Sequence, residues 1–260
     1  MYEKLIIKTD LRGVALVTIN RPEVSNAFND ALMIELTQAF LALGTDATVR
    51  VIVLTGAGKN FCAGGDIAWM KGHATHNRDE RIAGSQLVAD MLWAVYDCPK
   101  PVIARVNGAA FGGGVGLVCA ADVTVAAQSA RFALSEVRIG LIPANIAPFV
   151  VRRLGEANAR RFGLSGRVFS ASEAAGAGLV HNLAADAELD DAVEAEIGHF
   201  LQAAPEAIAR TKTLLAYVAR HDDDAIKAHT PTALADAWET ECGREGIATF
   251  LEKRPPSWRP

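Results

Sequence analysis

The sequence predicts an α/β fold, and two features of its 260 residues support that prediction. Short apolar runs typical of buried strands alternate with longer segments in which apolar residues recur at helical spacing. Residues 196–260 contain no strand-like run. We therefore expect an α/β core with parallel strand pairing over residues 1–195, followed by a helical region over 196–260.

The first half of the chain supplies most of the expected strands. "KLIIKTD" and "GVALVTIN" are β-branched runs separated by a turn at Arg12-Gly13, and they predict a hairpin. "VRVIVLTG", "KPVIARVNG" and "DVTVAA" are apolar runs typical of strands buried on both faces. These strands would form the sheet of the core.

The helices are predicted from apolar spacing and capping residues. A helix follows Asn29 or Asp30, either of which could cap it. The polar segment "KGHATHNRDER" precedes an amphipathic helix over about residues 80–96, and "GGGVGLVCAAD" predicts a short apolar helix. After "FALSEVRIGLIP" the chain is expected to be mostly helical. It ends in two helices with proline near each start, "PEAIARTKTLLAYVA" and "PTALADAWETECGREGIATFLEK".

Composition narrows the function classes. Half of the residues are hydrophobic and 22% are charged, as in soluble globular proteins. The net charge of −4 gives no reason to expect a nucleic-acid or membrane partner. Charges near the N-terminus do not suit a signal peptide, and no apolar run is long enough to span a bilayer. We expect a cytoplasmic protein.

Common nucleotide, metal and hydrolase motifs are missing from the sequence. There is no phosphate-binding GxxxxGK[ST], no GxGxxG and no GxSxG, since "GLSGR" misses that register by one place. The six histidines form no HExxH, and the four cysteines have no zinc-site spacing. We therefore predict no metal site and no redox or nucleotide cofactor.

Two glycine-rich turns remain, each after a predicted buried strand. "FCAGGDI" follows "VIVLTG", and "NGAAFGGGVG" follows "PVIARV". The first turn of a helix has unpaired N–H groups, and small side chains let a ligand oxygen approach them. Two such turns could aim two N–H groups at one oxygen and form an oxyanion hole. The alternative is that the glycines only let a helix cross close to a strand.

One carboxylate stands in an apolar sequence context. Glu136 lies within "RFALSEVRIGLIP". If it is desolvated, its pKa would be raised and it could exchange protons near neutral pH. The alternative is a structural ion pair with Arg131 or Arg138.

Taken in order, these segments resemble the crotonase superfamily, the enoyl-CoA hydratase/isomerase fold. The resemblance covers nearly the whole chain, from "NRPEVSNAFN" through "GKNFCAGGDI", "KPVIARVNGAAFGGGVGL" and "FALSEVRIGLIP" to "ATFLEKRPP". It implies a spiral of ββα turns with C-terminal helices for trimerisation, and either a homotrimer or a dimer of trimers. The implied ligand is an acyl-CoA thioester, whose coenzyme A is part of the substrate.

The resemblance also implies site residues. The catalytic set would be Glu136 with the N–H groups of Gly65 and Gly113 holding the thioester oxygen. Phe250 and Lys253 would cover the CoA of a neighbouring subunit. The full set of implied substrate-binding residues is Ser25, Ala27, Ala63, Gly65, Asp66, Ile67, Ala68, Gly112, Gly113, Phe250 and Lys253.

Position 116 departs from the pattern of the best-known hydratases, which carry a second glutamate there. Gly116 leaves Glu136 as the one implied acid/base group. A single carboxylate suits a Δ3,Δ2-enoyl-CoA isomerase, because one base can move a proton between C2 and C4. A closer resemblance to the bacterial 3-methylglutaconyl-CoA hydratase-like branch, which also has glycine there, favours hydration instead. A non-catalytic acyl-CoA-binding protein is the third possibility.

A substrate with a distal carboxylate would need a cation or hydrogen-bond donor at its acyl end. Lys71, Arg81 and Asn145 are the candidates by their position in the sequence. We therefore expect a hydro-lyase acting on a short or branched unsaturated acyl-CoA, with the isomerase as the second reading.

Overall fold

The computed structural model describes residues 2–259, and at its centre is a six-stranded sheet in the order β1-β2-β3-β4-β6-β9. The first two strands form the predicted antiparallel hairpin, and each later pair of neighbours is parallel. The predicted α/β core is therefore confirmed. The strands are β1 (Leu5–Thr9), β2 (Val14–Ile19), β3 (Val51–Gly56), β4 (Val102–Val106), β6 (Val123–Ala127) and β9 (Asn182–Ala184).

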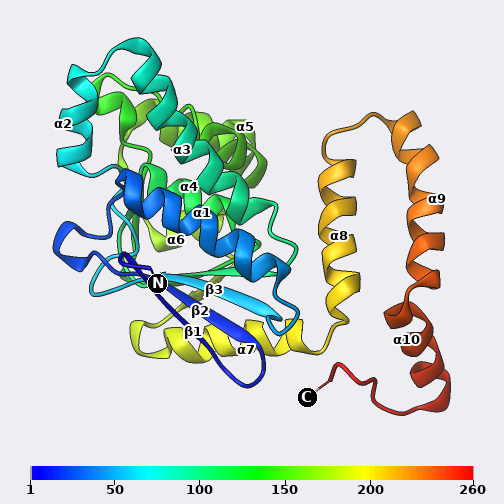
Figure 1. Cartoon of the computed structure of the whole chain (residues 1–260). Coiled ribbons are helices and arrows are strands. Elements are labelled where there is room, and N and C mark those ends of the chain that lie inside the picture. The colour runs from blue at the N-terminus through cyan, green and yellow to red at the C-terminus, as the bar shows by residue number, and fades with distance from the viewer. Residues whose placement is uncertain (1, 260) are drawn as a thin grey trace.

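Helices cover both faces of this sheet, which explains why β3 is buried along its whole length. Ile52 and Leu54 belong to the larger core cluster with residues of α1, α3, α4 and α5. Val51 and Val53 belong to a second cluster with α7 on the opposite face (Figure 1). These helices are α1 (Asp30–Thr45), α3 (Arg78–Tyr96), α4 (Gly113–Ala120), α5 (Ala147–Ser165, kinked at Gly155) and α7 (Leu189–Leu201).

A second, three-stranded sheet carries the glycine-rich turn that precedes α4. Its order is β5 (Ala110–Phe111), β7 (Arg131–Ala133) and β8 (Val168–Ser170). The chain after "FALSEVRIGLIP" is mostly helical, as expected, but it also contains the strands β8 and β9, which the sequence did not predict. Each has three residues, which is too short for a period-two pattern to stand out in the sequence.

Helix starts follow the side chains that cap them. Asn29 caps α1, accepting a hydrogen bond from Leu32 N–H at 3.0 Å, as predicted. The polar segment before the helix predicted over 80–96 is itself largely helical, since α2 spans Ile67–Thr75. Asn77 and Glu80 then form a capping box that starts α3 at Arg78. The short helices are α6 (Ala171–Gly176), η1 (Pro22–Val24), η2 (Glu136–Ile139) and η3 (Asp186–Glu188).

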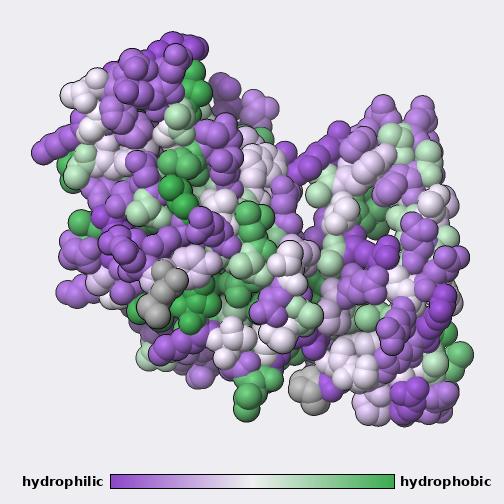
Figure 2. Space-filling view, viewed as in Figure 1, coloured by the Kyte–Doolittle hydropathy of each residue, from purple (hydrophilic) through white to green (hydrophobic). Residues whose placement is uncertain are grey.

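Three C-terminal helices lie to one side of the body of the molecule (Figures 1 and 2): α8 (Pro205–Val218), α9 (Asp223–Glu239) and α10 (Glu241–Glu252). Of these, α8 contacts the body, since Lys212 Nζ donates to Asp122 Oδ2 at 2.7 Å. The predicted proline start is correct for α8. It is wrong for the last predicted helix, because Pro231 lies inside α9 and the segment divides at Thr240, whose side chain caps α10. Large apolar side chains on these helices are exposed, namely Leu215, Val218, Leu234, Trp238, Ile247, Phe250 and Leu251.

Within residues 2–259 no helix has the length and apolar character needed to cross a membrane. The same part of the chain holds no group of three or more histidine, cysteine, aspartate or glutamate side chains placed to bind a metal ion.

Candidate active site

The two glycine-rich turns lie against each other, as the sequence predicts. Phe111 N–H donates to Cys62 O at 2.9 Å, and Cys62 N–H donates to Ala109 O at 3.0 Å. A Cβ atom added at Gly64 would lie 3.4 Å from the Gly113 nitrogen and 2.8 Å from the Phe111 oxygen. The turn after β3 and the turn before α4 therefore form one surface.

The N–H groups of Gly65 and Gly113 are free on this surface. Phe28 N–H donates to Gly64 O at 2.7 Å, and Asp66 N–H donates to Phe28 O at 2.8 Å. Phe28 therefore bonds to the residues on either side of Gly65 and not to the Gly65 N–H. Gly113 is the first residue of α4, where no earlier carbonyl accepts its N–H. Among residues 2–259 neither N–H has a protein acceptor.

Each glycine of "GGG" has its own structural reason. Gly112 adopts φ +51° and ψ −119°, a conformation that residues with a Cβ avoid. A Cβ on Gly113 would lie 2.3 Å from the Phe28 ring, and a Cβ on Gly114 would lie 2.2 Å from Cys62 O. The reading that these glycines permit close packing is correct, and the same close packing leaves the Gly113 N–H uncovered.

The Glu136 carboxylate lies beside this turn. A Cβ added at Gly112 would be 3.2 Å from Glu136 Oε1, while Glu136 Oε2 is buried and has no hydrogen-bond partner among the described residues. Burial raises the pKa of the Glu136 carboxyl above its ordinary value, and a hydrogen bond from its own backbone N–H only partly opposes this.

The alternative role for Glu136, a structural ion pair, is not observed. Arg131 Nη1 donates instead to the carbonyls of Ser129 and Ala130, both at 2.9 Å. Arg138 packs against the C-terminal turn of α5, where a Cβ on Gly166 would lie 2.9 Å from Arg138 Cγ. In the described chain Glu136 therefore pairs with neither arginine, and its carboxylate is available for chemistry.

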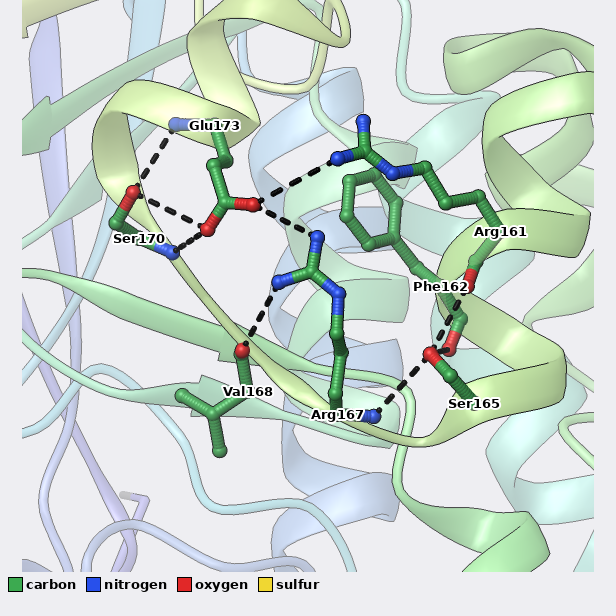
Figure 3. Close-up of polar contacts among 7 residues, drawn as sticks. All are labelled: Arg161, Phe162, Ser165, Arg167, Val168, Ser170 and Glu173. Carbon is green, nitrogen blue, oxygen red and sulfur yellow. Dashed lines mark hydrogen bonds and ion pairs between the residues drawn. The ribbon is translucent and has the colours of Figure 1, made fainter.

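A charged cluster links β8 and α6 to the C-terminal end of α5 (Figure 3). Arg167 Nη2 donates to Glu173 Oε1 at 2.7 Å, and Arg161 Nη2 lies 3.8 Å from the same oxygen. The Ser170 hydroxyl caps α6, accepting from Glu173 N–H at 3.2 Å. The hydrogen bond from Arg167 and those from Ser170 lower the pKa of Glu173 to about 2. This cluster ties β8 and α6 to the end of α5, on which Val137 and Arg138 of η2 pack.

The comparisons with known proteins agree with this geometry. A family model described as "Enoyl-CoA hydratase/isomerase" matches residues 9–260. The chain belongs to the enoyl-CoA hydratase/isomerase family. A crystal structure of an enoyl-CoA hydratase from Shewanella pealeana has a TM-score of 0.95 and 34% identity, covering 99% of this chain and 96% of that one. The expected crotonase fold is thus confirmed.

Two sequence relatives in this family have named substrates. The crotonyl-CoA hydratase of Syntrophomonas wolfei is 32% identical over 255 residues, which is 97% of this chain and 96% of that protein. The 2,3-dehydroadipyl-CoA hydratase of Escherichia coli K12 is 35% identical in an alignment of length 267 that covers 98% of this chain and 98% of that protein.

Ser25 to Ala27, which the resemblance assigns to the substrate-binding residues, lie next to the first glycine turn. Ser25 O accepts from Ala63 N–H at 3.0 Å, and the Ser25 hydroxyl accepts from Asn60 Nδ2 at 3.0 Å. Asn26 is fully buried at φ +58°, and its amide donates to the carbonyls of Ala57 and Asn60. These buried amide contacts, which sequence reasoning missed, fix the segment.

Asp66 has partners that its sequence position did not reveal. Arg21 Nη2 donates to Asp66 Oδ2 at 2.8 Å, and Asp66 Oδ1 caps α2 by accepting from Ala68 N–H at 2.8 Å. Burial acts to raise the pKa of Asp66, but the hydrogen bonds from Arg21 and Ala68 N–H outweigh it and lower the pKa. Its side chain therefore holds the turn that carries Gly65. Ile67 and Ala68, by contrast, are exposed at the start of α2.

The structure explains why position 116 is glycine. A Cβ on Gly116 would lie 2.3 Å from Ile146 Cγ2 and 3.3 Å from Leu92 Cδ2. The neighbouring Asn145 donates its amide to the Ser85 hydroxyl at 2.8 Å. Ile146 thus fills the space into which a side chain at position 116 would extend.

The candidates for the acyl end have different surroundings. Arg81 donates to the carbonyls of His73 and Ala74 at the end of α2, so its guanidinium is already engaged. Lys71 is exposed on α2. Trp69 and Met70 of the same helix are the side chains nearest to Gly65, since a Cβ there would lie 3.5 Å from Met70 Cγ and 3.8 Å from Trp69 Cε3.

Phe250 and Lys253 are not part of the site within one chain. Phe250 is 79% exposed on α10, and Lys253 ends that helix in a left-handed conformation, φ +55°. Both belong to α10 and its C-cap, in the C-terminal helical region to one side of the body (Figure 1).

Proposed function

We propose that this protein catalyses the reversible hydration of a short or branched α,β-unsaturated acyl-CoA. The observation that supports this most strongly is the position of Glu136. Its carboxylate is partly buried and unpaired beside the turn on which the Gly113 N–H is free. A proton-transfer group next to an oxyanion hole is what addition to a conjugated thioester requires.

In the proposed reaction, the thioester oxygen accepts hydrogen bonds from Gly65 N–H and Gly113 N–H. Glu136 takes a proton from water as the water oxygen bonds to C3, and the C2–C3 π electrons move to give the thioester enolate. The two N–H groups stabilise this enolate more than the neutral thioester, which accelerates the reaction. Glu136 then returns the proton to C2, and the 3-hydroxyacyl-CoA forms. These steps use only the thioester, water and protein groups.

Isomerisation of a Δ3-enoyl-CoA to the Δ2 isomer is the second candidate, and the packing at Gly116 favours it. Since Ile146 occupies the adjoining space, a second carboxylate does not fit there without a change in the core. One carboxylate can take a proton from C2 and return it to C4, or the reverse, through a thioester dienolate whose oxygen would be held by the same two N–H groups. Hydration is the first candidate because relatives across the whole chain length are hydratases.

We also propose the location and assembly expected from the sequence. The exposed apolar side chains of α8 to α10 suit burial against further copies in a homotrimer or a dimer of trimers. In such an assembly Phe250 and Lys253 would cover the CoA bound to a neighbouring subunit, with the Lys253 ammonium near a phosphate. A cytoplasmic location fits the acyl-CoA substrate.

A panel of three thioesters tests the proposal. Crotonyl-CoA, 3-methylglutaconyl-CoA and a 3-enoyl-CoA are each incubated with the protein while the absorbance of the conjugated thioester is followed. A decrease with either conjugated ester supports hydration, and an increase with the 3-enoyl ester supports isomerisation. No change with all three, despite binding of the esters, would overturn both and leave a non-catalytic acyl-CoA-binding protein.

A further inference from the structure

Helix α4 has two chemically distinct ends joined by an uncharged, buried segment. Its N-terminal residue is Gly113, whose N–H is free. Its sequence, GGVGLVCA, contains no charged side chain, and residues 114–120 are all buried. The last carbonyls of a helix have no partner within it and carry its negative dipole end. Groups at that end therefore influence a helix that starts in the candidate active site.

Arg153 of α5 occupies the C-terminal end of α4. Its Nη2 donates to the carbonyl oxygens of Ala121 and, at 3.4 Å, Cys119. Its Nη1 donates to Asp122 O at 3.3 Å. One guanidinium thus donates to one carbonyl of the last turn of α4, to that of its C-cap residue Ala121 and to that of the residue after it.

No carboxylate neutralises this guanidinium. Arg153 forms no ion pair among residues 2–259, and the nearby Asp122 carboxylate is engaged by Lys212 Nζ and by Val102 N–H, both at 2.7 Å. Burial lowers the pKa of Arg153, but an arginine remains protonated at neutral pH. A full positive charge therefore lies against the negative end of α4.

The histidine next to this guanidinium adds no second charge. Thr124 N–H donates to His181 Nδ1 at 2.9 Å, and His181 Nε2 lies 2.9 Å from Arg153 Nη1. Burial, together with the charge of Arg153, lowers the pKa of His181, which favours the neutral ring. The positive charge at this end of α4 therefore belongs to Arg153.

We infer that Arg153 is a positioning residue that orients α4 and strengthens the Gly113 N–H as a donor to the thioester oxygen. This rests on the proposed function. A cation at the C-terminus stabilises the helical conformation and fixes the last turn, and hence the direction in which the first N–H groups point. α4 has eight residues and is about 12 Å long. Because its surroundings are buried and apolar, the charge also acts on the enolate at the other end.

Substitution separates the charge of Arg153 from its hydrogen bonds. Arg153→Gln removes the charge and keeps a donor for the carbonyls, whereas Arg153→Lys keeps the charge but cannot reach all three carbonyls together. We expect kcat to fall about tenfold in the first variant and about threefold in the second, with KM nearly unchanged. Arg152→Gln is the matched control, since Arg152 lies on the same helix with its guanidinium over the Trp93 ring.

The decisive readout is the absorption of bound 4-(dimethylamino)cinnamoyl-CoA, a conjugated thioester that absorbs at longer wavelength when its carbonyl oxygen is polarised. The wild type and Arg152→Gln should give the full red shift, Arg153→Lys a smaller one, and Arg153→Gln the smallest. A lower melting temperature with unchanged red shift and kcat would show that Arg153 is merely structural and would overturn the inference.

Two further outcomes are distinguishable. If Arg153→Gln does not fold, Arg153→Lys decides, and a wild-type shift and kcat in that variant would overturn the inference. If the wild type binds the probe without any red shift, the oxyanion hole of the proposed function is wrong, and the inference is overturned with it. A red shift in the wild type that persists in Arg153→Gln overturns the inference alone.

Discussion

The Ile146 side chain occupies the space into which a side chain at position 116 would extend. A double-mutant cycle measures the coupling free energy between substitutions at these two positions. In Gly116→Ala the new methyl carbon would lie 2.3 Å from Ile146 Cγ2, so the core is overpacked. Overpacking costs about 1–3 kcal/mol, and the better helix propensity of alanine returns about 1 kcal/mol. We therefore expect the single variant to lose about 0–2 kcal/mol of unfolding free energy.

The second single variant and the double variant complete the cycle. Ile146→Ala leaves a cavity in a fully packed core and should cost about 2–5 kcal/mol. In Gly116→Ala/Ile146→Ala the new methyl group enters that cavity, so the overpacking term disappears. The coupling between the two substitutions should therefore be favourable, by about 1–3 kcal/mol.

Urea unfolding of the four proteins at one fixed protein concentration gives this coupling energy, because any subunit association would otherwise shift the apparent stability. Additive losses, with a coupling near zero, would show that Ile146 does not exclude a side chain from position 116. The explanation of Gly116 from packing would then be refuted.

Four further predictions concern the glutamates and the strained turn. Glu136→Gln should lower turnover about 10²–10⁴-fold, while the acyl-CoA affinity measured by calorimetry stays near that of the wild type. Glu156→Gln, on the surface of α5, is the control. Turnover of Glu136→Gln equal to that of the wild type would contradict the assignment of Glu136 as the acid/base group. Because Glu136 must be ionised to take a proton from water and burial raises its pKa, hydration should fall as pH drops through a midpoint above 4.5, and a flat profile down to that pH would contradict this. Gly112→Ala, which forces a Cβ onto φ +51° and within 3.2 Å of Glu136 Oε1, should lower stability by about 1–3 kcal/mol and reduce kcat, as urea unfolding and the thioester assay can check. The pKa of Glu173 is about 2 in the folded protein, which is below its value in the unfolded chain. Its pair with Arg167 therefore stabilises the protein at pH values above the unfolded pKa, and this stabilisation is lost as the pH falls toward 2. In Glu173→Gln that part of the acid dependence of stability should vanish.

Local patterns were enough to predict the elements with strong periodicity or capping. The hairpin, the buried strand β3 and the Asn29 cap follow from a few adjacent residues, so the sequence predicted them correctly. The strands β8 and β9 have three residues each and are held by pairing with distant segments. Their existence depends on tertiary contacts, which a short window of sequence does not contain.

The candidate site shows the same division. The glycine turns and Glu136 were found from their sequence context, because glycines after buried strands and an apolar-flanked carboxylate are local features. The residues that hold them were not found. Arg21 is 45 positions from Asp66, and Ile146 meets Gly116 from another element. Such contacts between distant residues become visible only in the folded chain.

Product analysis in D₂O tests the central claim most directly, namely that Glu136 moves a proton to an enolate held by Gly65 and Gly113. Crotonyl-CoA is incubated in D₂O with the wild type and with Glu136→Gln, and the product is analysed by mass spectrometry. We predict 3-hydroxybutyryl-CoA carrying one carbon-bound deuterium at C2 from the wild type, and formation of that product about 10²–10⁴-fold more slowly by the variant, although it still binds the thioester. Formation of the same deuterated product by Glu136→Gln at the wild-type rate would contradict it.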